Sequence, residues 1–298
     1  MKNILMHTPY VGFILLSMLA ACGSDDDAGK NAPPPVVKEC STCTYVVPEG
    51  KTTIDGAPNQ LNIKPGDVIC LGAGVKYTTL TFKNIIGTKE KPVVITNCAG
   101  TVNIQVVDKP FNLKTSNSKY FRITGGDVDG YYGIQLSGSK LDGLVLVEFS
   151  NNFEVDHIEL SNIGNAAVVA KTDPRCDDDN TLRGNFTMRD VSLHHNYIHD
   201  IGKEGFYIGH SYYYGYDKGG CGSLLPHTIE NISVYNNRVT NTGWDGMQVS
   251  CAVSGTRIHH NTIDNYGTKN DINQRDGIVI GGGTNALCYN NFVTNGKG

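Results

Sequence analysis

Three carboxylates share one local setting, each directly before a glycine. They are Glu204, Asp245 and Asp276, and an apolar-x-apolar run follows each glycine. Carboxylates held close together raise one another's pKa or recruit a cation. A raised pKa supplies a general acid for glycoside hydrolysis, whereas a recruited Ca²⁺ binds an acidic substrate. The alternative is that Asp-Gly serves only as a turn dipeptide.

Basic side chains flank these carboxylates. Lys203 and Arg275 each stand one residue before a carboxylate, and His210 follows the first of the three glycine motifs. Removal of a proton next to a carboxylate needs a base and a cation that stabilises the developing charge. The alternative is that these side chains are solvated turn residues. The catalytic candidates are therefore Lys203, Glu204, His210, Asp245, Arg275 and Asp276.

An internal repeat indicates which elements position these residues. Asparagines recur in the pattern apolar-x-x-Asn-x-apolar at Asn196, Asn237, Asn261 and Asn291, and an earlier copy has Asp156 instead. A coil of three short strands cannot bury its apolar face alone, but stacked coils bury a continuous core. The repeat predicts an all-β fold, a right-handed parallel β-helix with an asparagine ladder in one turn.

Stacking also predicts where the carboxylates lie. Equivalent residues of successive coils are about 4.8 Å apart. Glu204, Asp245 and Asp276 should therefore form one column, and we regard the same three residues as candidate Ca²⁺ ligands. Binding of Ca²⁺ would allow the column to hold the carboxylate of a uronate sugar.

Residues 61–298 resemble the pectate-lyase-like superfamily, specifically exported right-handed parallel β-helix repeat proteins. The segments LNIKPGDVICLGAG and GTKEKPVVITN resemble their first coils, in addition to the repeat above. The resemblance implies a solenoid with loop insertions, and it says little about activity because one fold hosts many functions. Polygalacturonases of this superfamily have aspartates before turn glycines, but their Gly-His-Gly and Arg-Ile-Lys motifs are absent from this sequence.

Two insertions interrupt the repeat, at residues 171–185 and 210–227. They belong to consecutive coils and should project side by side. Loops on a rigid scaffold often carry function. The second insertion contains four tyrosines, which are suited either to stacking on sugar rings or to packing the loop: Tyr212, Tyr213, Tyr214 and Tyr216.

The N-terminus reads as a targeting segment. Lys2 precedes an apolar run at 11–21 that is too short to span a bilayer, and Leu-Ala-Ala-Cys22 resembles a bacterial lipobox. We expect a signal peptide at 1–21, lipidation of Cys22, an acidic and Pro-rich tether at 22–39, and the β-helix at 40–298, whose native chain could extend past Gly298. The alternative is an ordinary signal peptide with an incidental cysteine. The acidic run after Cys22 resembles a surface-export signal, so we expect a lipid-anchored protein of the bacterial outer membrane at the cell surface.

Eight further cysteines are compatible with disulfides in an exported protein. Cys70 and Cys98 both follow strand-like runs, and Cys176 and Cys221 lie in the two insertions. We predict the pairs Cys70–Cys98 and Cys176–Cys221. The CxxC that starts at Cys40 has no second copy, which argues against a zinc or thioredoxin-like site.

The charge and the motifs together narrow the function. A net charge of −4 without a basic cluster argues against nucleic acid as a partner. The export signal, the fold, the tyrosines and the carboxylates favour a lyase or hydrolase of acidic polysaccharide. We expect a monomer that uses either no cofactor or Ca²⁺ and contacts the membrane through its lipid anchor alone. The missing family motifs favour the alternative, a noncatalytic glycan-binding or adhesin-like surface lipoprotein.

Overall fold

The computed structural model describes residues 39–298, so the predicted signal peptide, Cys22 and most of the tether lie outside the described residues. The described residues fold into three parallel sheets, with two short 3-10 helices, η1 (Cys40–Thr42) and η2 (Asp179–Thr181). They include no helix with the length and apolar character needed to cross a membrane.

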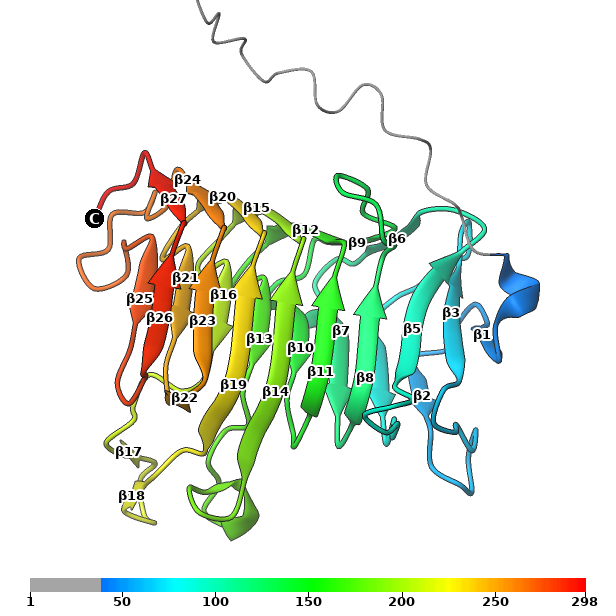
Figure 1. Cartoon of the computed structure of the whole chain (residues 1–298), viewed down its shortest axis with the longest axis horizontal. Coiled ribbons are helices and arrows are strands. Elements are labelled where there is room, and N and C mark those ends of the chain that lie inside the picture. Colours follow the sequence, from blue (N-terminus) through cyan, green and yellow to red (C-terminus); the bar gives the residue numbers. More distant parts are fainter. Residues whose placement is uncertain (1–38) are drawn as a thin grey trace, which may run out of the picture. The chain divides into compact units, whose positions relative to one another are not determined.

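Each coil contributes strands to sheets A, B and C, and each strand pairs in parallel with its equivalents in neighbouring coils (Figure 1). The predicted right-handed parallel β-helix is confirmed. Sheet A contains β1 (Tyr45–Val47), β3 (Val68–Gly72), β5 (Val93–Cys98), β8 (Lys119–Thr124), β11 (Asn151–Asp156), β14 (Thr187–His194), β19 (Thr228–Tyr235), β23 (Thr256–His259) and β26 (Ala286–Tyr289), with β22 (Ala252–Ser254) beside β19.

The other two sheets follow the same order along the axis. Sheet B contains β2 (Thr53–Asp55), β4 (Leu80–Lys83), β7 (Phe111–Ser116), β10 (Asp142–Leu146), β13 (Val168–Ala170), β16 (Phe206–Ile208), β21 (Met247–Val249) and β25 (Ile278–Ile280). Sheet C contains β6 (Val102–Gln105), β9 (Ile134–Ser137), β12 (Ile158–Ile163), β15 (Tyr197–Ile201), β20 (Arg238–Thr242), β24 (Thr262–Asp264) and β27 (Phe292–Thr294). A small hairpin joins β17 (Tyr216–Asp217) to β18 (Ser223–Leu224).

The core consists of inward-facing side chains that repeat at the same position in successive coils. In sheet C, Ile198, Val239 and Ile263 are paired in register and are fully buried. Alternation along each short strand turns one side chain inward and the next outward. The inward columns therefore hold the coils together, and the outward positions are free to carry chemistry.

The predicted asparagine ladder is present. Asn237 Oδ1 accepts hydrogen bonds from the backbone N–H and the side-chain amide of Asn196, both at 3.1 Å, and the ladder continues through Asn261 to Asn291. The alignment of Asp156 with this ladder was wrong by two residues. Ile158 holds the equivalent place and donates its N–H to Asn196 Oδ1 at 3.1 Å. Strand β11 continues through Asp156, which pairs with His194 in register.

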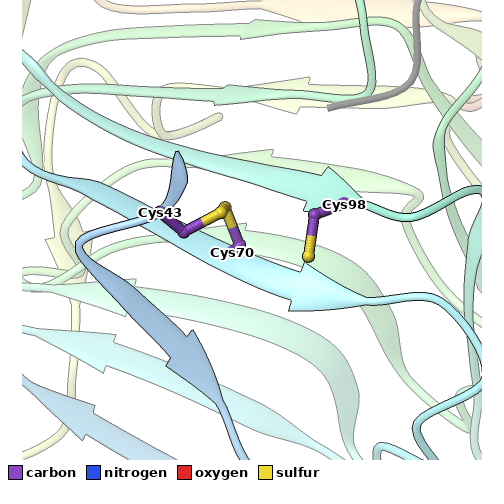
Figure 2. A group of neighbouring side chains, drawn as sticks. All are labelled: Cys43, Cys70 and Cys98. Atoms are coloured by element: carbon purple, nitrogen blue, oxygen red, sulfur yellow. A yellow bond between two sulfur atoms is a disulfide. The ribbon is translucent and has the colours of Figure 1, made fainter. Parts of the chain in front are cut away.

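The disulfides correct one predicted pair and confirm the other. Cys70 and Cys98 lie on neighbouring strands, but Cys70 pairs in register with Thr96, two residues away from Cys98. The CxxC segment instead supplies one partner to each strand, giving Cys43–Cys70 and Cys40–Cys98 (Figure 2 shows Cys43, Cys70 and Cys98). These bonds attach η1 to the first two long strands of sheet A. The predicted bond Cys176–Cys221 is present.

Candidate active site

The two insertions lie side by side at the turn from sheet B to sheet A, as expected (Figure 1, lower edge). Cys176–Cys221 joins them, and the Lys218 ammonium donates to the Pro174 carbonyl at 3.1 Å. The Arg183 N–H donates to the Leu225 carbonyl at 3.0 Å. The insertions therefore form one loop assembly on the rigid solenoid.

A cavity of about 250 Å³ opens beneath this assembly, next to the ends of strands β13 and β16. Both insertions and the outer face of sheet B contribute to its wall. The lining residues are Lys171, Asp173, Pro174, Tyr207, His210, Tyr212, Tyr216 and Lys218.

An ion pair forms one wall of the cavity. Lys171 Nζ lies 2.6 Å from Asp173 Oδ1 and 4.8 Å from the centroid of the Tyr207 ring. Burial alone would raise the pKa of Asp173, but the positive charge and hydrogen bond of Lys171 dominate and lower it. The carboxylate is therefore ionised at neutral pH and holds the Lys171 ammonium beside Tyr207.

The Tyr207 side chain projects from the middle of β16 toward the solvent side of sheet B. Its hydroxyl lies 2.9 Å from Ser211 Oγ, which in turn accepts a hydrogen bond from the Gln248 side-chain amide at 3.1 Å. The phenol therefore belongs to a hydrogen-bonded chain through which its orientation is fixed.

His210 is buried behind the cavity, and its protonation state follows from its neighbours. Its Nδ1 accepts the Tyr212 N–H at 3.2 Å, which leaves the ring proton on Nε2, 3.8 Å from Asp173 Oδ1. Burial, together with repulsion from Lys171, lowers the pKa of His210 to about 4. His210 is thus neutral at neutral pH, its Nε2–H faces Asp173 beyond hydrogen-bond distance, and its Nδ1 is not available as a base.

His227 supports the same wall from behind. Its Nε2 accepts the Thr172 N–H at 2.9 Å, and its Nδ1 donates to the Thr228 carbonyl at 2.9 Å. Burial lowers the pKa of His227 to about 4. The neutral ring therefore fixes the backbone between Lys171 and Asp173.

The structure divides the four predicted tyrosines into two pairs. Tyr212 and Tyr216 line the cavity with their ring centroids 5.3 Å apart. Tyr213 packs instead against the Arg183 guanidinium, 3.9 Å from its ring, and Tyr214 is 85% exposed outside the cavity. Only the first pair is in a position to contact a ligand in the cavity.

The carboxylate column exists with the predicted stacking. The Gly205 N–H donates to the Asp245 carbonyl at 3.1 Å, and the Gly246 N–H donates to the Asp276 carbonyl at 2.9 Å. Close packing between coils explains why glycine follows the carboxylate, since a Cβ at Gly205 would lie 2.4 Å from the Gly246 carbonyl oxygen.

Two of the three carboxylates are nearly inaccessible. Glu204 is 7% exposed and Asp245 only 1%, and Asp245 Oδ1 accepts the Asp276 N–H at 2.8 Å. Burial, with the neighbouring carboxylates, raises the pKa of Glu204 and raises that of Asp245 to about 6. The column stands before the strands of sheet B, whereas His210 follows β16 at its other end, so these predicted catalytic residues do not form one site.

Lys203 and Arg275, the two basic candidates beside the column, each contact another side chain of the protein. Lys203 Nζ lies 4.3 Å from the centroid of the Trp244 ring, and the Arg275 guanidinium donates to Asn270 Oδ1 at 3.1 Å. Their catalytic roles, and Ca²⁺ binding by the column, stay predictions.

A second polar cluster on sheet A has the composition of a metal site. Glu154, Asp156 and His194 bring three possible ligand atoms together. However, the Arg122 guanidinium contacts both oxygens of Asp156, at 2.7 and 2.9 Å. Burial alone would raise the pKa of Asp156, but hydrogen bonds from His157, Arg122 and Thr124 outweigh it and lower the pKa. The guanidinium therefore already supplies the positive charge that a metal ion would bring.

Sequence reasoning missed Lys171, Asp173, Tyr207 and Lys218. One signal was available, because alternation in the strand Phe206–Ile208 places Tyr207 outward. The others come from two insertions whose mutual contact has no local sequence pattern.

Comparison with known proteins agrees with the fold. No family model matches the chain, and no curated protein matches it in sequence. A solved structure, alginate lyase from Paenibacillus sp. str. FPU-7, has a TM-score of 0.57 and 21% identity over 84% of this chain and 76% of that chain. A GH136 lacto-N-biosidase from Eubacterium ramulus has a TM-score of 0.35 and 12% identity over 84% and 67%, too low to inform the fold. The first likeness shows that both chains share the parallel β-helix.

Proposed function

We propose that the protein is a cell-surface polysaccharide lyase that cleaves uronate-containing chains in the cavity beneath the two insertions. The observation that carries the proposal is the Lys171 ammonium, held by Asp173 against the ring of Tyr207. This arrangement combines a fixed positive charge with a hydroxyl that can transfer protons, the two requirements of β-elimination next to a carboxylate. The fold shared with an alginate lyase gives additional support.

Five residues of the cavity have a direct role in this reaction. Lys171 and Lys218 neutralise the uronate carboxylate, which makes the neighbouring C–H bond more acidic. Tyr207 oxygen accepts the proton from that carbon while its own hydroxyl proton passes to the departing glycosidic oxygen. The C–H and C–O bonds break, a C=C bond forms, and Tyr207 ends in the protonation state in which it began. Tyr212 and Tyr216 offer aromatic faces to the sugar ring.

The test is the ultraviolet absorbance of the unsaturated product, measured with a panel of uronate polysaccharides. We expect turnover, and a decrease in kcat of about 10²–10⁴-fold in Tyr207→Phe, because that is the usual contribution of a positioned proton-transfer group. Lys171→Gln should lose activity as well. Tyr214→Phe is the matched control, since this tyrosine lies outside the cavity, and it should retain the parent rate.

Chelation of Ca²⁺ separates this site from the carboxylate column. Activity should survive chelation, because lysines supply the positive charge in the cavity. A loss of activity on chelation would instead support Ca²⁺ at Glu204, Asp245 and Asp276. Reducing ends without ultraviolet absorbance, abolished by Asp245→Asn, would support a hydrolase. Glycan binding without either product would support the noncatalytic alternative.

A further inference from the structure

A second groove lies at the turn between sheets A and C, beside the asparagine ladder. Its volume is about 600 Å³, and residues from several coils form its wall. The cavity at Lys171 occupies a different corner of the solenoid, the turn from sheet B to sheet A. The residues that matter for its chemistry are Asp129, Tyr132, His195, Asn236, Arg238 and His260.

Arg238 is the basic side chain in the wall of the groove. It is exposed at the start of β20, and within residues 39–298 no carboxylate lies within salt-bridge distance of it. Its guanidinium lies 4.8 Å from the centroid of the Tyr197 ring, and that ring lies 5.8 Å from the ring of Tyr132 and 4.4 Å from the ring of His199. The aromatic shelf thus orients a guanidinium whose N–H groups remain open to a planar anion.

The remaining wall of the groove is polar and largely uncharged. His195 Nε2 accepts the Asn236 side-chain amide at 3.0 Å, and His260 Nε2 has the same contact with Asn290 at 3.2 Å. Burial and the neighbouring His194 and His157 lower the pKa of His195. The His195 imidazole and the amides of Asn236 and Asn290 are therefore neutral partners suited to hydroxyl groups.

Asp129 lies at the rim of the groove beside His195, 89% exposed and 3.6 Å from His195 Nε2. It lies on the loop between β8 and β9. Because this loop reaches His195, the groove runs from the coil of β15 to the coil of β24, which is two coil steps or roughly 10 Å along the axis. The groove is thus long enough for an oligosaccharide rather than a single sugar.

We infer that this groove is a noncatalytic binding site for an acidic oligosaccharide. The Arg238 guanidinium pairs with a sugar carboxylate, Tyr132 contacts a ring face, and Asp129, His195 and Asn236 bond to hydroxyls. This site goes beyond the proposed lyase activity and does not depend on it. Its effect is to hold an acidic polymer on the protein at a second place along the solenoid.

The test is calorimetric titration of the full protein carrying Tyr207→Phe, so that the probe stays intact. The probes are hexasaccharides prepared from alginate and from polygalacturonate, with a neutral hexasaccharide of glucose for comparison. We expect two binding sites for an acidic probe. Adding Arg238→Gln should weaken one of them about tenfold, the loss of roughly one charge-assisted pair. The neutral probe should bind that site more weakly than the acidic ones.

Arg257→Gln is the matched control, because Arg257 is an exposed arginine outside the groove. It should preserve both sites, whereas Asp129→Asn, at an exposed loop position, should weaken the same site as Arg238→Gln. The inference is overturned by absence of acidic-probe binding, by unchanged binding in Arg238→Gln, or by an equal loss in Arg257→Gln. If instead the lyase proposal fails, the parent protein forms no unsaturated product. Binding of the acidic probe is then still weakened by Arg238→Gln.

Discussion

At the residue scale, burial has opposite consequences for the histidines and the carboxylates. Burial lowers the pKa of His210 to about 4, so the ring is neutral, with Nε2 3.8 Å from Asp173 Oδ1. Burial raises the pKa of Asp245 to about 6, so this carboxyl holds its proton at mildly acidic pH. A perturbed pKa alone does not identify a catalytic group, because Asp245 is nearly inaccessible while Tyr207 and Lys171 line an open cavity.

We predict that Asp245→Asn stabilises the protein above pH 6. A carboxyl whose folded pKa is raised contributes stability that is complete below its unfolded value of 3.8 and is lost as pH rises through about 6. Asparagine keeps an oxygen that can accept the Asp276 N–H and carries no charge to desolvate. The free energy of unfolding should rise by about 1–2 kcal/mol at pH 8.

Thermal melting from pH 3.5 to pH 8 measures this effect. The difference in Tm between Asp245→Asn and the parent should be small at the acidic end and grow across the window between 3.8 and about 6. Asp108→Asn is the control, since Asp108 is exposed and lies between β6 and β7, several coils away from Asp245. A difference independent of pH would contradict the titration of Asp245 as its cause.

At the element scale, the sequence predicts those structural features whose residue pattern repeats from coil to coil. Ladder asparagines and turn glycines recur in every late coil, because stacking imposes the same packing on each, so their places could be predicted. The pair Cys70–Cys98 could not be excluded, since a two-residue offset between β3 and β5 becomes visible only in the register. The cavity depends on contact between two insertions, for which no repeated pattern exists.

We predict that the disulfide between the insertions matters more for activity than for global stability. Replacing both Cys176 and Cys221 with serine frees the two loops, while the core of stacked coils stays intact. Because Lys218 comes from the second insertion and Lys171 from the first, loosened loops should misplace the two charges and lower kcat/KM about tenfold or more. The Tm should change little, because the loops lie outside the core.

Initial rates and melting curves of the double variant provide the measurement. Cys288→Ser is the control, because Cys288 is an exposed free cysteine and its replacement should change neither quantity. Parent-like kcat/KM in the double variant would mean that contacts such as Lys218 to Pro174 suffice to hold the loops.

At the scale of the whole molecule, the solenoid separates two possible contacts with one polymer. The cavity lies at the turn from sheet B to sheet A, and the groove at Arg238 lies at the turn from sheet A to sheet C. Binding at two places on one rigid scaffold raises the effective concentration of a long chain. Arg238→Gln should therefore slow cleavage of long polymers more than cleavage of trisaccharides.

The last prediction concerns how the protein is attached to the cell surface. Cys22→Ser in the full chain should abolish incorporation of labelled fatty acid and move the protein from the membrane fraction to the soluble fraction, because the thiol is the predicted site of the lipid. Replacing the three aspartates at 25–27 with asparagine should keep the lipid but reduce digestion by protease added to intact cells.

Cys288→Ser controls for loss of a thiol. A Cys22→Ser protein that stays lipidated and sediments with membranes would show that the lipid is attached elsewhere. Equal digestion of the anchored protein with and without the aspartates would mean that the acidic run is only a solvated tether.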